Sequence, residues 1–273
     1  MPTYFSSAIA YIQENGDELE RARLAGLLGR SRPEPKVARA LLARQNEDGG
    51  FPYGLIQGRP SAITATGVAM QWMQDLRLLP SSYVERAAAY LLTVQRPEGA
   101  WEESPAVLRY DPPALGRPGS PLARAYCTSL AACWTARLLG RRHDAVTRAT
   151  ACLREGKDGG RPVDEPAHVT AQVAAALMMA DGPSSPAAVA ALEALRRVLP
   201  ETWTADRLAD ALGALYTGGL PSEDSLAASG LRRLLSLQRP DGGWSSEYGA
   251  DRDVDLSLRA LGVLLAYGVS TTV

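Results

Sequence analysis

The chain has 273 residues, 46% of them hydrophobic, and 29 basic against 30 acidic residues give a net charge of −1. This length supports one large hydrophobic core. The balanced charge argues against a nucleic-acid-binding protein and against a charged disordered tail. An odd number of cysteines, three in all, argues against a disulfide framework and favours a reducing compartment.

The first residues show no basic segment followed by an apolar run, so we expect no signal peptide. No apolar run reaches the roughly 18 residues that a transmembrane helix needs. We therefore expect a cytoplasmic protein without a transmembrane segment.

In chain order, a helix with one charged face alternates six times with a helix that is apolar around most of its circumference. The first kind is predicted near 3–13, 34–46, 81–95, 142–154, 184–198 and 223–238. The second kind is predicted near 18–29, 62–78, 123–140, 166–181, 204–218 and 253–268. Helices that are apolar nearly all round belong inside. The pattern predicts an all-α fold, an (α/α)6 toroid of six helical hairpins spanning 1–273 as one domain, with an open solenoid as the structural alternative.

A repeated turn links several of these hairpins. It reads LLARQNEDGGFPYG, LLTVQRPEGAWEES and LLSLQRPDGGWSSE, with a glutamine followed six residues later by an aromatic residue: Gln45 and Phe51, Gln95 and Trp101, Gln238 and Trp244. The first two glutamines are 50 residues apart, and the third follows 143 residues later, close to three such periods. We expect each glutamine to bond the free backbone groups at the helix end, and the aromatic side chain to pack over the turn.

Gln-x-x-Asp-Gly-Gly-Trp on paired helices resembles the QW repeat. This repeat marks the superfamily of squalene–hopene cyclase, the class II diterpene cyclases and the β subunits of protein prenyltransferases. The resemblance extends over most of the chain and implies the same double ring of helices. Because the whole superfamily shares the repeat, it does not select one activity.

The last hairpin resembles the class II cyclases further. Those enzymes carry Asp-x-Asp-Asp-Thr-Ala at the start of an inner helix, and here Asp253-Val254-Asp255-Leu256-Ser257 stands at that place, with Leu256 instead of the last aspartate. The resemblance implies that Asp255 protonates a double bond and that Asp253 supports it. The alternative is that Asp253 caps the helix and Asp255 favours its dipole.

Carbocation chemistry needs aromatic walls, because π faces stabilise cations. Only 6% of the residues are aromatic, which favours a small pocket. We expect substrate contacts from inner-helix and turn residues, with one histidine beside the aromatic rings: Trp72, Tyr126, Trp134, His168, Tyr216 and Tyr248.

The stretch 103–125 interrupts the repeat with a long segment rich in proline and glycine. Compact domains seldom carry such segments without a function. We expect a loop insertion or a lid at the mouth of the barrel.

These observations favour a class II terpene cyclase-like enzyme that protonates an isoprenoid or an isoprenoid diphosphate. With a diphosphate we would expect bound Mg²⁺, and no other cofactor is predicted. Because the cyclases it resembles use two helical domains, a partner subunit or a homodimer would supply the second.

Three alternatives remain open. A prenyltransferase β-like subunit would bind zinc near Cys127 and His168, although Ala125 replaces the aspartate of that family's site. A non-catalytic scaffold would use the ring only to bind partners. A glycan-processing enzyme would pair Asp164 or Glu165 with Asp255 across the barrel.

Overall fold

The computed structural model describes residues 3–29, 33–155, 167–198 and 202–269. These residues form twelve α-helices and one two-stranded antiparallel sheet, β1 (Phe51–Pro52) with β2 (Ser61–Ala62). None of the described helices is long and apolar enough to cross a membrane.

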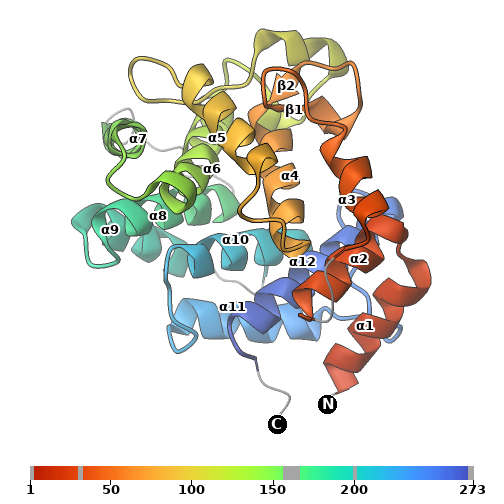
Figure 1. The fold of residues 1–273 in the computed structure, drawn as a ribbon. Helices are drawn as coiled ribbons and strands as arrows, with labels where there is room; N and C mark the ends of the chain where they lie inside the picture. The colour runs from red at the N-terminus through yellow and green to blue at the C-terminus, as the bar shows by residue number, and fades with distance from the viewer. Residues whose placement is uncertain (1–2, 30–32, 156–166, 199–201, 270–273) are drawn as a thin grey trace.

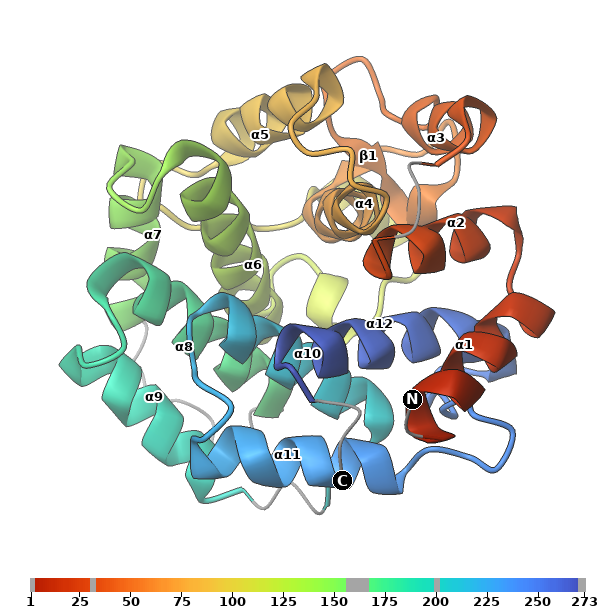
Figure 2. The same ribbon diagram turned by 60° about the horizontal axis from the view of Figure 1, so that its bottom comes forward.

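Six helices form an outer ring and six an inner ring (Figures 1 and 2). The outer helices are α1 (Thr3–Asn15), α3 (Pro35–Leu42), α5 (Ser82–Val94), α7 (Asp144–Glu155), α9 (Pro186–Arg196) and α11 (Ser225–Ser236). The inner helices are α2 (Glu18–Leu27), α4 (Ile63–Asp75), α6 (Pro121–Leu139), α8 (Ala167–Asp181), α10 (Ala205–Thr217) and α12 (Asp253–Ala266).

Each inner helix packs against the next along the chain, and α12 returns to α2 and α1. The ring of helices is therefore closed, and Figure 2 shows it in a view where the helices surround a common centre. The predicted (α/α)6 toroid is confirmed, and every predicted helix is found within a few residues of its expected range. The open solenoid is wrong, because the last hairpin contacts the first.

The three glutamines make the same pair of hydrogen bonds. Each side-chain amide donates to the carbonyl of the turn glycine four residues later and to a carbonyl at the start of the next outer helix. For Gln238 the second acceptor is Tyr4 O at 3.0 Å, in α1. This bond joins the last hairpin to the first, so the predicted role of the repeat at the helix ends is confirmed, and the repeat also closes the ring.

The aromatic residue of each turn is tied to the inner helix that follows. The backbone N–H groups of Phe51, Trp101 and Trp244 donate to hydroxyls of Thr66, Thr128 and Ser257 at 2.9 to 3.1 Å. All three aromatic side chains are fully buried. Each turn thus fixes the distance between an outer helix and the inner helix that follows it.

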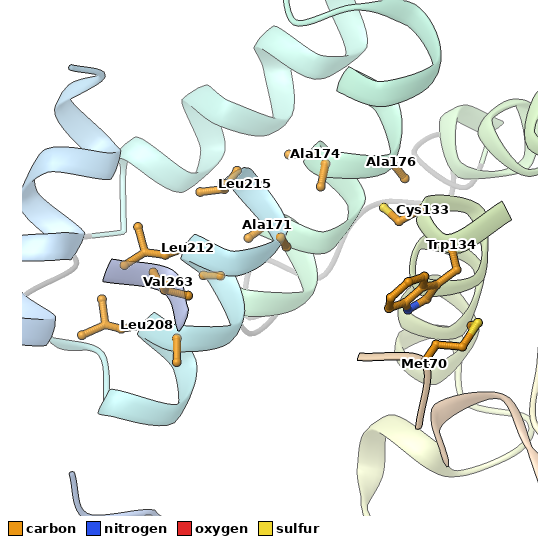
Figure 3. Close-up of a cluster of buried hydrophobic side chains, with 14 of the residues drawn as sticks. Met70, Cys133, Trp134, Ala171, Ala174, Ala176, Leu208, Leu212, Leu215 and Val263 are labelled. Carbon is orange, nitrogen blue, oxygen red and sulfur yellow. The ribbon is translucent and has the colours of Figure 1, made fainter. Parts of the chain in front are cut away.

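Interior packing is tight around these contacts. Figure 3 shows Trp134 of α6 beside Met70 of α4, and Leu208 and Leu212 of α10 near Val263 of α12. The core is one large cluster to which each of the twelve described α-helices contributes at least one buried side chain. A large continuous core of this kind provides the main favourable free energy of folding.

Residues 103–120 carry two short 3-10 helices, η2 (Pro105–Tyr110) and η3 (Ala114–Gly116). The segment is anchored at its first residue: the buried Glu103 carboxylate accepts bonds from Ile63 N and Thr64 N, 2.8 Å each, and so caps α4. Figure 2 shows the yellow-green segment behind the centre of the ring. The helix α6 begins at Pro121, slightly earlier than predicted, because the Ser120 hydroxyl accepts a bond from its first turn.

The ring-closing turn leaves no room for a side chain at Gly242. This glycine has φ +93°, and a Cβ there would lie 2.2 Å from the carbonyl oxygen of Ser7 in α1. We expect Gly242→Ala to lower the free energy of unfolding by at least ~3 kcal/mol, from backbone strain and the clash together. Thermal and urea unfolding would measure this loss.

Gly58 provides the matched control, because it has φ +82° but no neighbouring atom within 4 Å of the position that a Cβ would take. Gly58→Ala should therefore lose only about 1 kcal/mol, the strain of the left-handed backbone alone. Equal losses in the two variants would contradict the close approach of α1 to the last turn.

Candidate active site

The inner ring encloses a cavity of about 580 Å³ that all six inner helices line. About half of the lining residues are apolar, with large side chains from α2, α4, α6 and α12: Leu27, Val68, Leu130, Trp134, Leu258 and Val263. Glycines at 67, 213 and 262 widen it, since they present no side chain. The volume is typical of small-molecule sites, and the wall combines apolar side chains with many polar ones.

Polar groups occur along the whole of this cavity. Tyr126, His168 and Asp210 lie in the first halves of their inner helices, whereas Asp75 and Arg137 lie in the last turns of theirs. Tyr126 and Arg137 are eleven residues apart on α6, which is about 16 Å along a helix.

A fully buried arginine joins two aspartates at the junction of α2, α4 and α12. Arg23 is 1% exposed, and its guanidinium lies 3.0 Å from Asp75 Oδ2 and 2.7 Å from Asp255 Oδ1. Trp72 stacks on the same guanidinium at 4.8 Å. A cation this deeply buried requires such partners, because desolvation alone would be very unfavourable.

Arg259 continues this array along α12. Its guanidinium contacts Asp255 at 3.2 Å, Asp206 at 2.6 Å and Asp210 at 2.5 Å. Asp255 is thus held between two arginines, Arg23 and Arg259.

The two arginines hold the pKa of Asp255 below its ordinary value, although burial acts against them as the largest single influence. The carboxylate is ionised at neutral pH, and its side chain is not part of the cavity wall. A proton donor must instead carry a proton at rest. The environment of Asp255 is therefore the opposite of what its predicted role as the acid requires.

Asp75 has the complementary environment. It lines the cavity, is 5% exposed, and burial raises its pKa against the opposing effects of Arg23 and of the Gln71 amide, which donates to Oδ1 at 2.9 Å. The sequence reasoning missed this residue. Its signal was a carboxylate in the last turn of an apolar helix, where the helix dipole disfavours negative charge.

Asp253 has a structural role in the described contacts. Its side chain accepts a bond from Ser246 N at 2.8 Å and pairs with Arg239, and it is 6% exposed. It orders the turn that leads into α12. The alternative prediction that it caps this helix is wrong, because α12 begins at Asp253 itself and has no side-chain cap at its start.

Four of the six predicted substrate contacts line the cavity: Tyr126, Trp134, His168 and Tyr216. The other two do not. Trp72 packs on Arg23, outside the wall, and Tyr248 lies in an exposed turn with 63% of its surface accessible. The sequence predicted these substrate contacts from the position of each aromatic residue in the chain. That position does not determine the direction in which the ring points.

The predicted zinc site does not form among the residues that the structure describes. No group of three or more histidine, cysteine or acidic residues lies close enough there to hold a metal. Cys127 is fully buried beside the Leu115 carbonyl, and burial raises its thiol pKa well above the ordinary value. Asp164 and Glu165, either of which was predicted to pair with Asp255 in a glycan-processing site, lie outside the described residues.

No protein-family model and no curated protein matches the chain. Solved structures do match its fold. The type II terpene cyclase MstE from Scytonema is 17% identical, with a TM-score of 0.58 and 97% of each chain covered. The same cyclase with merosterolic acid A, its product, gives a TM-score of 0.59 at 18% identity, with 96% of this chain and 95% of that chain covered. A protein from Actinoplanes gives 0.58 at 16% identity, covering 97% and 99%.

The stability contribution of Asp255 should depend on pH. A folded-state pKa below the unfolded value means that the contribution is present above about pH 4 and is lost as pH falls through the folded value. We expect Asp255→Asn to lose about 1.5–3 kcal/mol at pH 7, the range for hydrogen bonds to charged groups. Urea unfolding from pH 7 to pH 3 should show the difference from the natural chain shrinking, and a constant difference would contradict the ionised state.

At under 20% identity over nearly the full length of both chains, these matches show that this protein has the fold of the type II terpene cyclase MstE.

Proposed function

We propose that this protein is a type II terpene cyclase-like enzyme, which protonates an isoprenoid in the central cavity and cyclises it. The observation that carries the proposal is a buried carboxyl, Asp75, with a raised pKa in the wall of the central cavity. The shared fold supports it, since MstE has been solved with geranylgeranyl dihydroxybenzoate as its substrate. In that cyclase, variants of an aspartate were used for substrate and product complexes.

We assign the proton donor to Asp75 and a supporting role to Asp255. Both carboxyls contact Arg23, yet their pKa values move in opposite directions. Two titratable groups with separated pKa values are typical of acid and base assignments in enzymes. With Asp255 ionised, Arg23 is already neutralised, and the proton on Asp75 is retained more easily.

The proposed reaction transfers the Asp75 proton to the terminal carbon–carbon double bond of the substrate. The double bond's electron pair forms the new C–H bond, and the neighbouring carbon becomes a cation. Further double bonds attack in turn and close rings, until loss of a proton forms a final double bond. The overall change is an isomerisation, and the indole of Trp134 in the wall can stabilise a cation by its π face.

The charges of the wall favour an uncharged isoprenoid over a diphosphate. The described wall contains two arginines, Arg137 and Arg259, and the second is paired with three aspartates. A diphosphate would need several unpaired cations or a metal site beside it. One ring encloses the cavity, so the proposal requires no second helical domain.

Replacing Asp75 and Asp255 one at a time distinguishes which of them is the acid. We expect Asp75→Asn to reduce cyclisation of farnesol or geranylgeraniol at least about 100-fold at every pH, because general acid catalysis contributes that much or more. Product formation would be measured by gas chromatography with mass spectrometry.

Asp255→Asn should behave differently. Without Asp255, Arg23 acts on Asp75 alone and lowers its pKa, so activity should fall at pH 7 and recover as the pH is lowered. If Asp255 were the acid instead, its replacement would abolish activity over the whole pH range, and Asp75→Asn would have the weaker effect.

Cavity size should select the length of the substrate. A Cβ at Gly213 would lie 3.5 Å from Val263, an ordinary contact, so Gly213→Leu should be accommodated and extend into the cavity. We expect affinity for geranylgeraniol to fall at least tenfold and affinity for farnesol to change less, measured by calorimetry. Ala190→Leu on the exposed outer face of α9 adds a side chain of the same kind and should leave both unchanged.

A further inference from the structure

Two neighbouring loops form a surface feature that the proposed reaction does not use. Residues 53–60 join β1 to β2, and residues 104–111 contain η2. Both loops lie at the top of Figure 1, beside the labelled strands. Val107 packs there against Ala62 and Ala65 in a small buried cluster separate from the main core. The two loops therefore have a core of their own, which fixes one against the other.

An array of stacked aromatic and guanidinium groups joins the two loops. The rings of Tyr53 and Tyr110 stack with their centroids 5.8 Å apart and their planes 19° from parallel. Arg59 lies over Tyr110 at 4.5 Å and over Tyr53 at 6.0 Å, and Arg109 lies over Tyr110 at 5.5 Å. Contacts between a cation and a π face hold these long side chains in place before a ligand arrives. Binding by this array would therefore cost less side-chain entropy than binding by mobile arginines.

Two positive charges of this array have no negative partner. Neither Arg59 nor Arg109 forms an ion pair with any residue that the structure describes. The exposed aspartate of the second loop, Asp111, pairs instead with Arg117 at 2.7 Å. Because both unpaired guanidiniums lie against the ring of Tyr110, they repel each other, and an anion beside them would be attracted to both. The charge of the surface is therefore complementary to an acidic ligand.

Exposed aliphatic side chains accompany the arginines. Ile56 is 49% exposed and Leu108 is 46% exposed. A Cβ at Gly54 would lie 3.4 Å from Arg59 Nη1 and 3.9 Å from Ile56 Cδ1, so this aliphatic side chain and this guanidinium are neighbours. Tyrosine and arginine are among the side chains that contribute most to binding at protein–protein interfaces. Apolar groups exposed beside them are typical of such interfaces.

We propose that these two loops dock an acidic segment of a partner protein. Carboxylates of the segment bind Arg59 and Arg109, and an apolar side chain next to them packs on Ile56 and Leu108. We call this the tyrosine–arginine surface and define it by six residues: Tyr53, Ile56, Arg59, Leu108, Arg109 and Tyr110. None of the six lines the central cavity, so the inference does not depend on the proposed reaction.

A protein partner fits this surface better than an anionic bilayer does. The Asp111 side chain is 93% exposed and directly follows Tyr110 in the chain. The negative surface potential of anionic lipids would repel this carboxylate. A folded or extended acidic segment can instead place its own carboxylates on the arginines and leave Asp111 in water.

The test uses two short labelled peptides as probes. One has alternating glutamate and leucine residues, and the other has glutamine in place of each glutamate. The natural chain should bind the glutamate peptide at least about tenfold more tightly than the glutamine peptide, measured by fluorescence anisotropy. Arg59→Gln combined with Arg109→Gln should remove this difference, because loss of a charged partner at an interface costs that much or more. Failure of the natural chain to bind the glutamate peptide, or equal binding of the two peptides, would overturn the proposal.

Arg141 and Arg142 provide the matched control. Both are exposed and follow α6, whereas the loop that carries Arg109 precedes it. Arg141→Gln combined with Arg142→Gln removes the same charge from another surface and should leave the affinity for the glutamate peptide unchanged. An equal loss in the two double variants would mean that the peptide responds only to net charge, which contradicts a specific surface.

Two further measurements use the natural chain and do not depend on the folding of a variant. In hydrogen–deuterium exchange the glutamate peptide should slow exchange in residues 53–60 and 104–111 and not in 140–143; slower exchange only outside these two loops would place the binding elsewhere and overturn the proposal. Cosedimentation with vesicles of phosphatidylserine and phosphatidylcholine tests the lipid alternative. We expect no binding, and vesicle binding that the Arg59 and Arg109 replacements abolish would show a lipid-binding surface in place of the proposed one.

Discussion

The fold depends on one repeated interaction, a glutamine amide that donates to its own turn and to the next outer helix at the same time. The two donors of one NH₂ group thereby bind a carbonyl of the turn and a carbonyl in the first turn of the next outer helix. In the last turn the second carbonyl belongs to Tyr4, in the first helix of the chain. The same bond that spaces the hairpins along the chain also joins its two ends.

Closure of the ring has a chemical consequence, because six inner helices that meet side by side leave a central space that their side chains do not fill. Glycines and alanines on the inner faces keep that space open, and polar side chains from the inner helices line about half of it. In such surroundings each charge depends strongly on its nearest partner, since little water is present to screen it. Arg23 illustrates this, because it contacts two carboxyls whose pKa values shift in opposite directions. The pKa of Asp255 is lowered, and the pKa of Asp75 is raised.

The sequence pattern predicted only part of the candidate site. The aspartate pair of the last hairpin led to Asp253 and Asp255, and the structure places both in ion pairs, away from the cavity wall. The pattern located the right neighbourhood, since Asp255 contacts Arg259, which is part of the wall, and is linked to Asp75 through Arg23. Asp75 itself lies 180 residues earlier in the chain, and nothing local to it indicates that an arginine from α2 will pair with it.

The sequence by itself determined the number of hairpins, the division into outer and inner helices and the turns that link them, because helical periodicity, glycine turns and the spacing of glutamine and tryptophan are local properties. Only the tertiary structure decided which carboxyl faces the cavity, which aromatic rings line it and which are packed elsewhere. Those outcomes depend on the rotation of each helix about its axis and on partners from distant hairpins. A shift of one residue along a helix turns a side chain by about 100°, which is enough to move it from the wall into the space between the helices.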